Sequence, residues 1–427
     1  MKPDVSVLKN VGFRRLWLSQ LTSTLATNLL TFGYVLALYE ISGSNAYVAL
    51  LVGFQSIPPI IFSSVAGVIA DSYGRRRILV WVNLGRVLVA LLSIFTTQSA
   101  FIILVAAFFL QIITQFFVPA AAAAIPQVVK PEKLFAANSF FTLTMYAMFL
   151  VGYGAAGPLI DLIGTPLTFA LAMLLYLIAT SASMLLPKLD EHLKMLSHKT
   201  INFFHQLGLV WHRFVEGLRY VRRDFIIFFI LLQVSVLIAV EKAFASLMPA
   251  FALDFLGFSK SAISFTFILP TALGTLIGVI LANRLKTKIS KFRLISTGLV
   301  LDALALLFAV LIYPIANSLL WLLPSLSPEV FRTAIVICLA MLSGFADPFI
   351  IVSAQTILQE RVPNQEQGRV FGLQNTVQNM FAFLPVFIIG ALDGILAVPV
   401  IISVLGALIA VLAFLGIYFF KTKNSAG

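Results

Sequence analysis

Twelve long apolar runs constrain the fold of this chain more than any other feature of its sequence. They lie near residues 13–39, 46–70, 78–96, 101–124, 135–160, 166–187, 225–252, 262–283, 292–313, 331–358, 370–392 and 397–420. A helix needs about 20 apolar residues to cross a bilayer. The runs are continuously apolar rather than alternating, which excludes a transmembrane β-barrel. The sequence therefore predicts an all-α membrane protein with twelve transmembrane helices.

The composition agrees with this prediction, because 60% of the residues are hydrophobic and only 11% are charged. The first run is long and lacks a small-residue cleavage site, so we expect it to stay in the membrane as a helix rather than to be removed as a signal peptide. The sequence has a single cysteine, Cys338, which lies within a run. Because a disulfide needs two cysteines, an intrachain disulfide is excluded.

The basic residues are distributed unevenly between the two ends of the runs. If the N-terminus is cytoplasmic, all but four of the 29 lysines and arginines fall in cytoplasmic segments. Lys260 and Arg332 fall in outer loops, and Arg86 and Lys242 lie within runs. This asymmetry predicts a multi-pass protein of the plasma (inner) membrane with both termini in the cytoplasm. It also accounts for the net charge of +12 without a nucleic-acid partner.

The runs divide into two sets of six. We expect an N-terminal half at 1–187, a cytoplasmic linker at 188–224 and a C-terminal half at 225–427. The linker alternates arginines with aromatic and aliphatic residues, which predicts an amphipathic helix at the inner membrane surface. The histidines at 198, 205 and 212 are interpreted as a solvated face, because no carboxylate or thiol cluster accompanies them.

The connection between the second and third runs carries the most informative motif. Residues 67–77 read GVIADSYGRRR, with one acid between two glycines and three arginines. The pattern resembles the same loop in transporters of the major facilitator superfamily. Four further blocks resemble the branch that holds macrolide-efflux proteins and the enterobactin exporter, namely 13–20 (FRRLWLSQ), 116–126 (FFVPAAAAAIP), 216–221 (EGLRYV) and 359–372 (QERVPNQEQGRVFG).

The resemblance implies two pseudo-symmetric six-helix halves, with a substrate site between them near mid-membrane. It implies a secondary active transporter that exports amphiphilic or drug-like compounds by alternating access, as a proton antiporter of multidrug type. The expected partners are a small amphiphilic substrate, protons and membrane lipid. The protein is expected to be a monomer without a cofactor.

The resemblance also implies a conformational latch at residues 67–77. In the family, the matching acid meets the start of the eleventh helix in the other half, and that start is Gly368–Arg369 in this sequence. Glycines permit close helix approach and tight turns. The predicted latch residues are Gly67, Asp71, Gly74, Arg75, Gly368 and Arg369.

Two acids inside the runs are the candidate coupling residues. Asp347 is followed by Pro348, which weakens local helix bonding, and Glu241 lies in the run 225–252. Ionisable groups within a membrane are costly and are functional hypotheses by default. The alternatives are a packed Asp347 that satisfies the disrupted backbone, and a Glu241 that joins an outer gate. Arg86 and Asp302 occupy equivalent depths in peripheral runs, where a structural role is favoured.

Polar side chains within the runs predict the lining of a cavity. The candidates are Gln20, Thr24, Thr27, Asn28, Gln111, Gln115, Gln233 and Asn379. Thr27 stands where many members of the branch carry an acid, and the fourth run lacks the arginine of many drug:proton antiporters. The sequence therefore does not demonstrate proton antiport, and Asp347 and Glu241 are the candidate coupling residues.

No catalytic constellation, nucleotide-binding loop or metal-ligand cluster occurs in the sequence, so we expect neither an enzyme nor a bound metal. Two alternatives to the exporter remain. One is a lipid or siderophore carrier without proton antiport. The other is a membrane sensor or scaffold that transports nothing.

Overall fold

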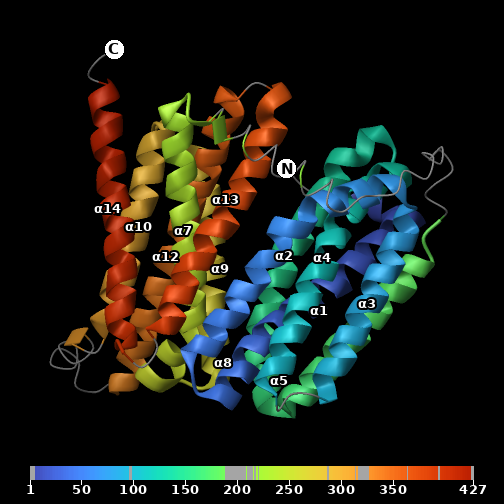
Figure 1. The fold of residues 1–427 in the computed structure, drawn as a ribbon, viewed down its shortest axis with the longest axis horizontal. Helices are drawn as coiled ribbons and strands as arrows, with labels where there is room; N and C mark the ends of the chain where they lie inside the picture. Colours follow the sequence, from blue (N-terminus) through green and yellow to red (C-terminus); the bar gives the residue numbers. More distant parts are fainter. Residues whose placement is uncertain are drawn as a thin grey trace. The chain divides into compact units, whose positions relative to one another are not determined.

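The structure is a computed structural model that describes residues 5–95, 99–187, 208, 215, 218–219, 221–285, 288–312, 314–315, 327–362, 364–392 and 395–424. All regular structure in these residues is helical (Figure 1). Each of the twelve predicted runs is occupied by helix, which confirms the all-α prediction. The chain forms two compact units, one of Met1–Gly43 with Phe54–Trp211 and one of Ser44–Gly53 with His212–Gly427.

The described residues of the first unit form five long α-helices and two short 3-10 helices. They are η1 (Val5–Lys9), α1 (Val11–Ser42), α2 (Asn45–Ser72), α3 (Arg75–Phe95), α4 (Ala100–Val128), η2 (Pro131–Lys133) and α5 (Leu134–Met184). The first residues of α2, up to Gly53, belong to the second unit, where Gly53 lies against Phe387 and Ala49 against Gly390.

The α5 element consists of two helices joined at one glycine. Gly164 has φ 81° and ψ 163°, a conformation that side-chain-bearing residues rarely adopt. Phe141 near the start of α5 and Leu186 just after its end belong to the same apolar cluster as Phe13. The chain therefore reverses direction at Gly164, and α5 holds both predicted runs, 135–160 and 166–187.

The described residues of the second unit form seven α-helices and two π-helical segments. They are α7 (Phe225–Pro249), η3 (Ala250–Phe255), α8 (Lys260–Ile263), η4 (Ser264–Ile268), α9 (Leu269–Leu285), α10 (Lys291–Val310), α12 (Pro328–Arg361), α13 (Asn364–Ala391) and α14 (Val398–Asn424). Both η3 and η4 are π-helical. The sequence does not predict either segment, because a π-helical turn has no composition of its own among apolar residues.

Within the second unit, α9 and α12 cross with their backbones in contact. A Cβ atom on Gly344 would lie 2.7 Å from the carbonyl carbon of Thr271, and one on Gly274 would lie 2.9 Å from the amide nitrogen of Phe345. The hydroxyl of Thr271 donates across the crossing to the carbonyl of Ala340 at 3.2 Å. Small residues at helix crossings are typical of membrane proteins, because the hydrophobic effect does not hold helices together in lipid.

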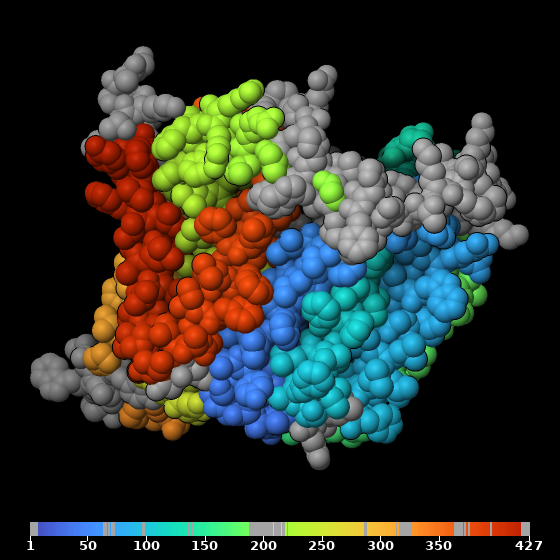
Figure 2. Space-filling view, in the orientation of Figure 1, coloured from blue at the N-terminus to red at the C-terminus, as the bar shows by residue number. Residues whose placement is uncertain are grey.

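Large apolar side chains on the outer faces of several helices remain exposed. On α3, Trp81 and Leu92 are 70% and 60% exposed, and on α14 Phe414 is 67% exposed. Both helices lie at the surface of their units in Figure 2. Ten helices in the described residues are long and apolar enough to cross a membrane, with α5 counted as one. These surfaces are suited to contact with lipid, so the chain is a multi-pass membrane protein.

Most of the predicted linker, 188–224, lies outside the described residues, and so does most of its proposed amphipathic helix. The same holds for His198, His205 and His212.

Candidate functional site

Two acids from different helices meet inside the second unit. Glu241 is on α7 and Asp347 is on α12, and their carboxyl groups interact with each other. Glu241 Oε1 and Asp347 Oδ1 are buried and accept no hydrogen bond from any described residue. The structure therefore brings together the two residues that the sequence singles out separately, and it leaves an oxygen of each unsatisfied.

A third carboxyl belongs to the same group. Asp302 on α10 is 3% exposed, and its Oδ1 accepts a hydrogen bond from the Ser343 hydroxyl at 2.6 Å. The charge of Asp302 acts on both Glu241 and Asp347. The sequence places Asp302 in a run interpreted as peripheral, so its approach to Asp347 is not predicted.

One basic residue accompanies these acids. Lys242 Nζ donates to Asn379 Oδ1 at 3.0 Å, which links α7 to α13. The lysine charge acts on Glu241, its neighbour along the chain. Glu241, Asp302 and Asp347 form a carboxyl cluster, with Lys242 as its counter-charge.

The chemistry of the carboxyl cluster follows from its charges. Two carboxylates in contact repel each other, and a proton shared between them removes the repulsion. A charge inside a membrane protein is costly unless it is paired. Protons or an organic cation can neutralise the cluster. Within the described residues, no group of three or more histidine, cysteine, aspartate or glutamate side chains is arranged to hold a metal ion.

The first unit holds a different polar centre. Arg86 on α3 is 2% exposed, donates to the Ser23 hydroxyl, and has its guanidinium carbon 4.7 Å from the ring centre of Phe117 and 5.8 Å from that of Tyr176. The side chain of Asn83 donates to Ser19 at 3.2 Å and to Ser183 at 3.1 Å. Aromatic faces stabilise the buried cation, and the polar centre joins α1, α3, α4 and α5.

The predicted cavity residues of α1 occupy different environments. Thr27 forms a hydrogen bond with Tyr176 at 2.9 Å, next to the Arg86 centre. Gln20 is 3% exposed and donates to the Phe141 carbonyl at 3.2 Å. Asn28 packs its side chain against Gly152 of α5, and Thr24 is partly exposed.

The remaining predicted cavity residues also separate. On α4, Gln111 and Gln115 are partly exposed, and the Gln115 side chain donates to the Gln111 carbonyl at 3.3 Å. Gln233 is fully buried and lies against Gly416 of α14. Asn379 accepts a hydrogen bond from Lys242, the counter-charge of the carboxyl cluster.

The predicted latch falls largely outside the described side chains. The structure places Gly67 and Asp71 in α2, and Gly368 and Arg369 in α13, without describing their side chains. Gly74 precedes α3, which begins at Arg75, and its carbonyl accepts from the Ile78 amide at 3.1 Å. Gly74 does not have a positive φ, so the turn there needs no left-handed residue.

Two arginines cap the last carbonyl groups of α5. Arg15 of α1 donates to the Leu185 carbonyl, and Arg76 of α3 donates to the Met184 carbonyl. Cations at a helix C-terminus stabilise its unpaired carbonyl groups. The sequence indicates only a topological role for Arg76, because nothing in the local sequence shows that the end of α5 lies beside it.

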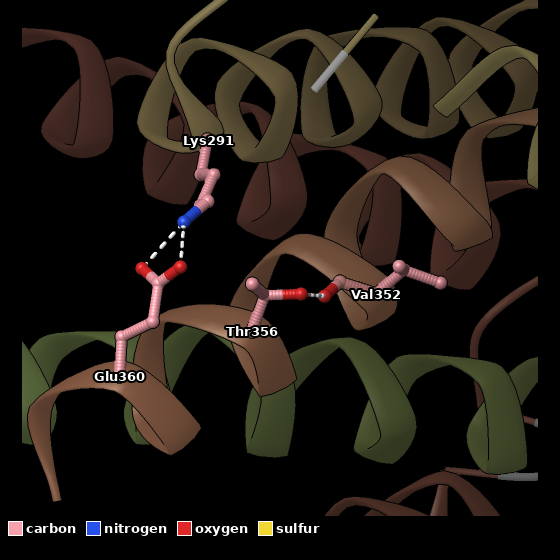
Figure 3. Close-up of polar contacts among 4 residues, drawn as sticks. All are labelled: Lys291, Val352, Thr356 and Glu360. Atoms are coloured by element: carbon pink, nitrogen blue, oxygen red, sulfur yellow. Dashed lines mark hydrogen bonds and ion pairs between the residues drawn. The ribbon is translucent and has the colours of Figure 1, made fainter. Parts of the chain in front are cut away.

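Ion pairs join the helix ends on one side of the second unit. Glu360 of α12 pairs with Lys291 of α10, as Figure 3 shows. The next residue, Arg361, pairs with Asp224 at 3.4 Å, and the Asp224 carboxylate also caps α7 by accepting from the Ile226 amide at 2.8 Å. The end of α12 is therefore tied to two neighbouring helices.

The fold and this buried polar interior are those of a membrane transporter. The sequence matches the Major Facilitator Superfamily over residues 16–385, so the chain belongs to this family.

Several individual proteins are similar to this chain in sequence or in fold. The chain is 24% identical to macrolide efflux protein A of Streptococcus pyogenes over 377 residues, which cover 86% of each chain. It is 23% identical to macrolide efflux protein A of Enterococcus faecalis over 337 residues, which cover 77% of this chain and 95% of the relative. Among solved structures, the nucleoside transporter NupG has a similar fold, with a TM-score of 0.68 at 15% identity, covering 96% of this chain and 99% of that one.

Proposed function

We propose that the chain exports amphiphilic, macrolide-like compounds in exchange for protons, by alternating access. The observation that carries the proposal is the contact between Glu241 and Asp347 inside the second unit, with one unsatisfied oxygen on each. A proton held by this pair leaves when a cationic or amphiphilic substrate takes its place, which couples the two fluxes. The curated relatives named macrolide efflux proteins support the choice of substrate.

The direct test is substrate-dependent proton movement in inverted membrane vesicles. Addition of a macrolide should move protons in the wild type, whereas Asp347→Asn and Glu241→Gln should each abolish this movement. An amide keeps the size of the carboxyl but cannot release a proton. Asp254→Asn is the matched control, because Asp254 is an exposed acid of the same unit. If both cluster variants move protons as the wild type does, the assignment of the coupling site is wrong.

Measurement of substrate flux in the same vesicles separates the alternatives. Macrolide flux that survives collapse of the proton gradient supports a carrier without antiport. The absence of flux for any amphiphile, lipid or siderophore supports a membrane sensor or scaffold.

A further inference from the structure

We infer that Asp302 is a second proton-holding carboxyl of the transport site and that Ser343 connects it to Asp347; this inference rests on the proposed proton-coupled function. The residue lies on α10, outside the contacting pair, and three observations carry the inference.

The first observation is the environment of Asp302. It is 3% exposed, and a single neutral donor, Ser343, serves it among the described residues. A buried carboxylate normally needs several donors or a cation to replace its lost hydration. The charged groups that act together with Asp302 are Glu241 and Asp347, which carry the same sign.

Among the described residues, no basic side chain of the helices packed against α10 pairs with Asp302. α10 packs on α12 and α14. The sequence of α14 has no Asp, Glu, Lys, Arg or His between Val398 and Phe420. On α12, the acid nearest along the chain to Ser343 is Asp347, and Lys242 of α7 acts on Glu241. A proton is therefore the available means of neutralising Asp302.

The second observation is the placement of Ser343. Ser343 and Asp347 are four residues apart on α12, so their side chains project from the same helix face on adjacent turns. The hydroxyl of Ser343 already donates to Asp302. Because a hydroxyl can accept one hydrogen bond while it donates another, Ser343 is placed to pass a proton between Asp347 and Asp302.

The third observation is the close packing of this part of α12. Close to the acids, Gly344 of α12 packs on the backbone of α9, and Gly298 of α10 packs on Ala346. Two backbone contacts on different sides hold Ser343 and Asp347 at a fixed distance from α10. Such fixed geometry is what transfer through a single hydroxyl requires.

Charge counting then gives a quantitative expectation. Three carboxyls and one lysine are neutral together when two protons are bound. With Asp302 replaced by asparagine, the remaining two carboxyls and the lysine are neutral with one proton. The inference therefore predicts that Asp302→Asn removes about one of the protons that exchange with the substrate.

The test uses the full-length protein purified in detergent in weak buffer. Proton release on macrolide addition is measured with a pH dye, and macrolide binding is measured as a function of pH. The slope of the logarithm of Kd against pH gives the number of protons exchanged. Asp302→Asn should release about one proton fewer than the wild type for each macrolide bound. An unchanged proton count in Asp302→Asn overturns the inference.

A second set of variants addresses the role of Ser343 and guards against a simple folding defect. Ser343→Ala should slow proton release after rapid mixing at least about tenfold, since transfer depends on the positioned hydroxyl, and Ser343→Thr should restore the rate. Ser353→Ala is the control, because Ser353 is another buried serine of α12. If Ser343→Ala releases protons at the wild-type rate, Ser343 does not connect the carboxyls.

The outcomes separate this inference from the proposed function. If the wild type binds or moves macrolide without any proton release, the proposed proton coupling itself fails. If the wild type releases protons and Asp302→Asn releases the same number, only the inference about Asp302 fails.

Discussion

The backbone contact between α9 and α12 gives the sharpest prediction about stability. Replacing Gly344 with alanine adds one methyl group at the crossing. That methyl carbon would lie 2.7 Å from the carbonyl carbon of Thr271 and 2.8 Å from its Cα, whereas ordinary contacts begin at 3.4 Å. The neighbours are backbone atoms, which cannot rotate away as a side chain does.

The size of the effect follows from this geometry. The two helices must separate by at least about 0.7 Å, and a gap of this size forfeits roughly a quarter to a half of the dispersion energy between the facing atoms. Overpacking of this kind costs about 1–3 kcal/mol, and the hydrogen bond from Thr271 to Ala340 is stretched as well. We expect Gly344→Ala to lose about 2–3 kcal/mol of stability.

The assay is thermal unfolding of the purified protein in detergent. For a unit of about 200 residues, a loss of 2–3 kcal/mol lowers Tm by about 4–12 °C. Gly154→Ala on α5 is the matched control, because a Cβ there meets nothing within 4 Å. Alanine favours helix over glycine by up to about 1 kcal/mol, so the control should keep or raise Tm. If Gly344→Ala and Gly154→Ala unfold at the same temperature, the backbone contact does not have the role assigned to it.

Three further predictions concern other parts of the chain. Arg86→Lys should lower Tm by several degrees, because lysine cannot keep the buried stacking and hydrogen bonding of the guanidinium, which are worth about 2 kcal/mol or more. Arg77→Lys is the control at an exposed position and should not lower Tm. Equal melting curves for the two variants would contradict this prediction. Asp224→Ala should lower the free energy of unfolding by about 0.5–2 kcal/mol through loss of the α7 cap, as measured by the same melting assay. Glu360→Gln breaks an exposed ion pair and should lower it by less than about 1 kcal/mol. A larger effect for Glu360→Gln than for Asp224→Ala would refute the assignment of the cap. Asp71→Asn should slow macrolide export roughly twofold to fivefold, because it removes the charge of the proposed latch, while membrane insertion stays normal. Export by this variant at the wild-type rate in vesicles would contradict the latch proposal.

The apolar runs predict the helices well because the membrane imposes both their length and their composition. Glu241 and Asp347 can be singled out for the same reason, since a charge in an apolar run is conspicuous. Their contact cannot be predicted, because about a hundred residues separate them and the sequence does not state which helix faces meet.

The polar residues show the same limit. The sequence predicts Gln233 beside a cavity, and the structure packs it against α14. The sequence favours a structural role for Asp302 because its run is interpreted as peripheral, whereas its hydrogen bond to Ser343 brings it to the carboxyl cluster. Helical periodicity gives the relative directions of side chains on one helix, and the neighbours in each direction come only from tertiary packing.

The reversal of the chain at Gly164 has a consequence for any reagent that approaches from outside the cell or from within it. The two arms of α5 are joined through one left-handed glycine, with helix on both sides of it. Whichever face of the membrane this turn occupies, it contains no extended loop that a protease could cleave and no segment long enough to form an antibody epitope. An epitope tag inserted there would have to unwind helix on one side or the other, so labelling studies of this protein should place tags elsewhere.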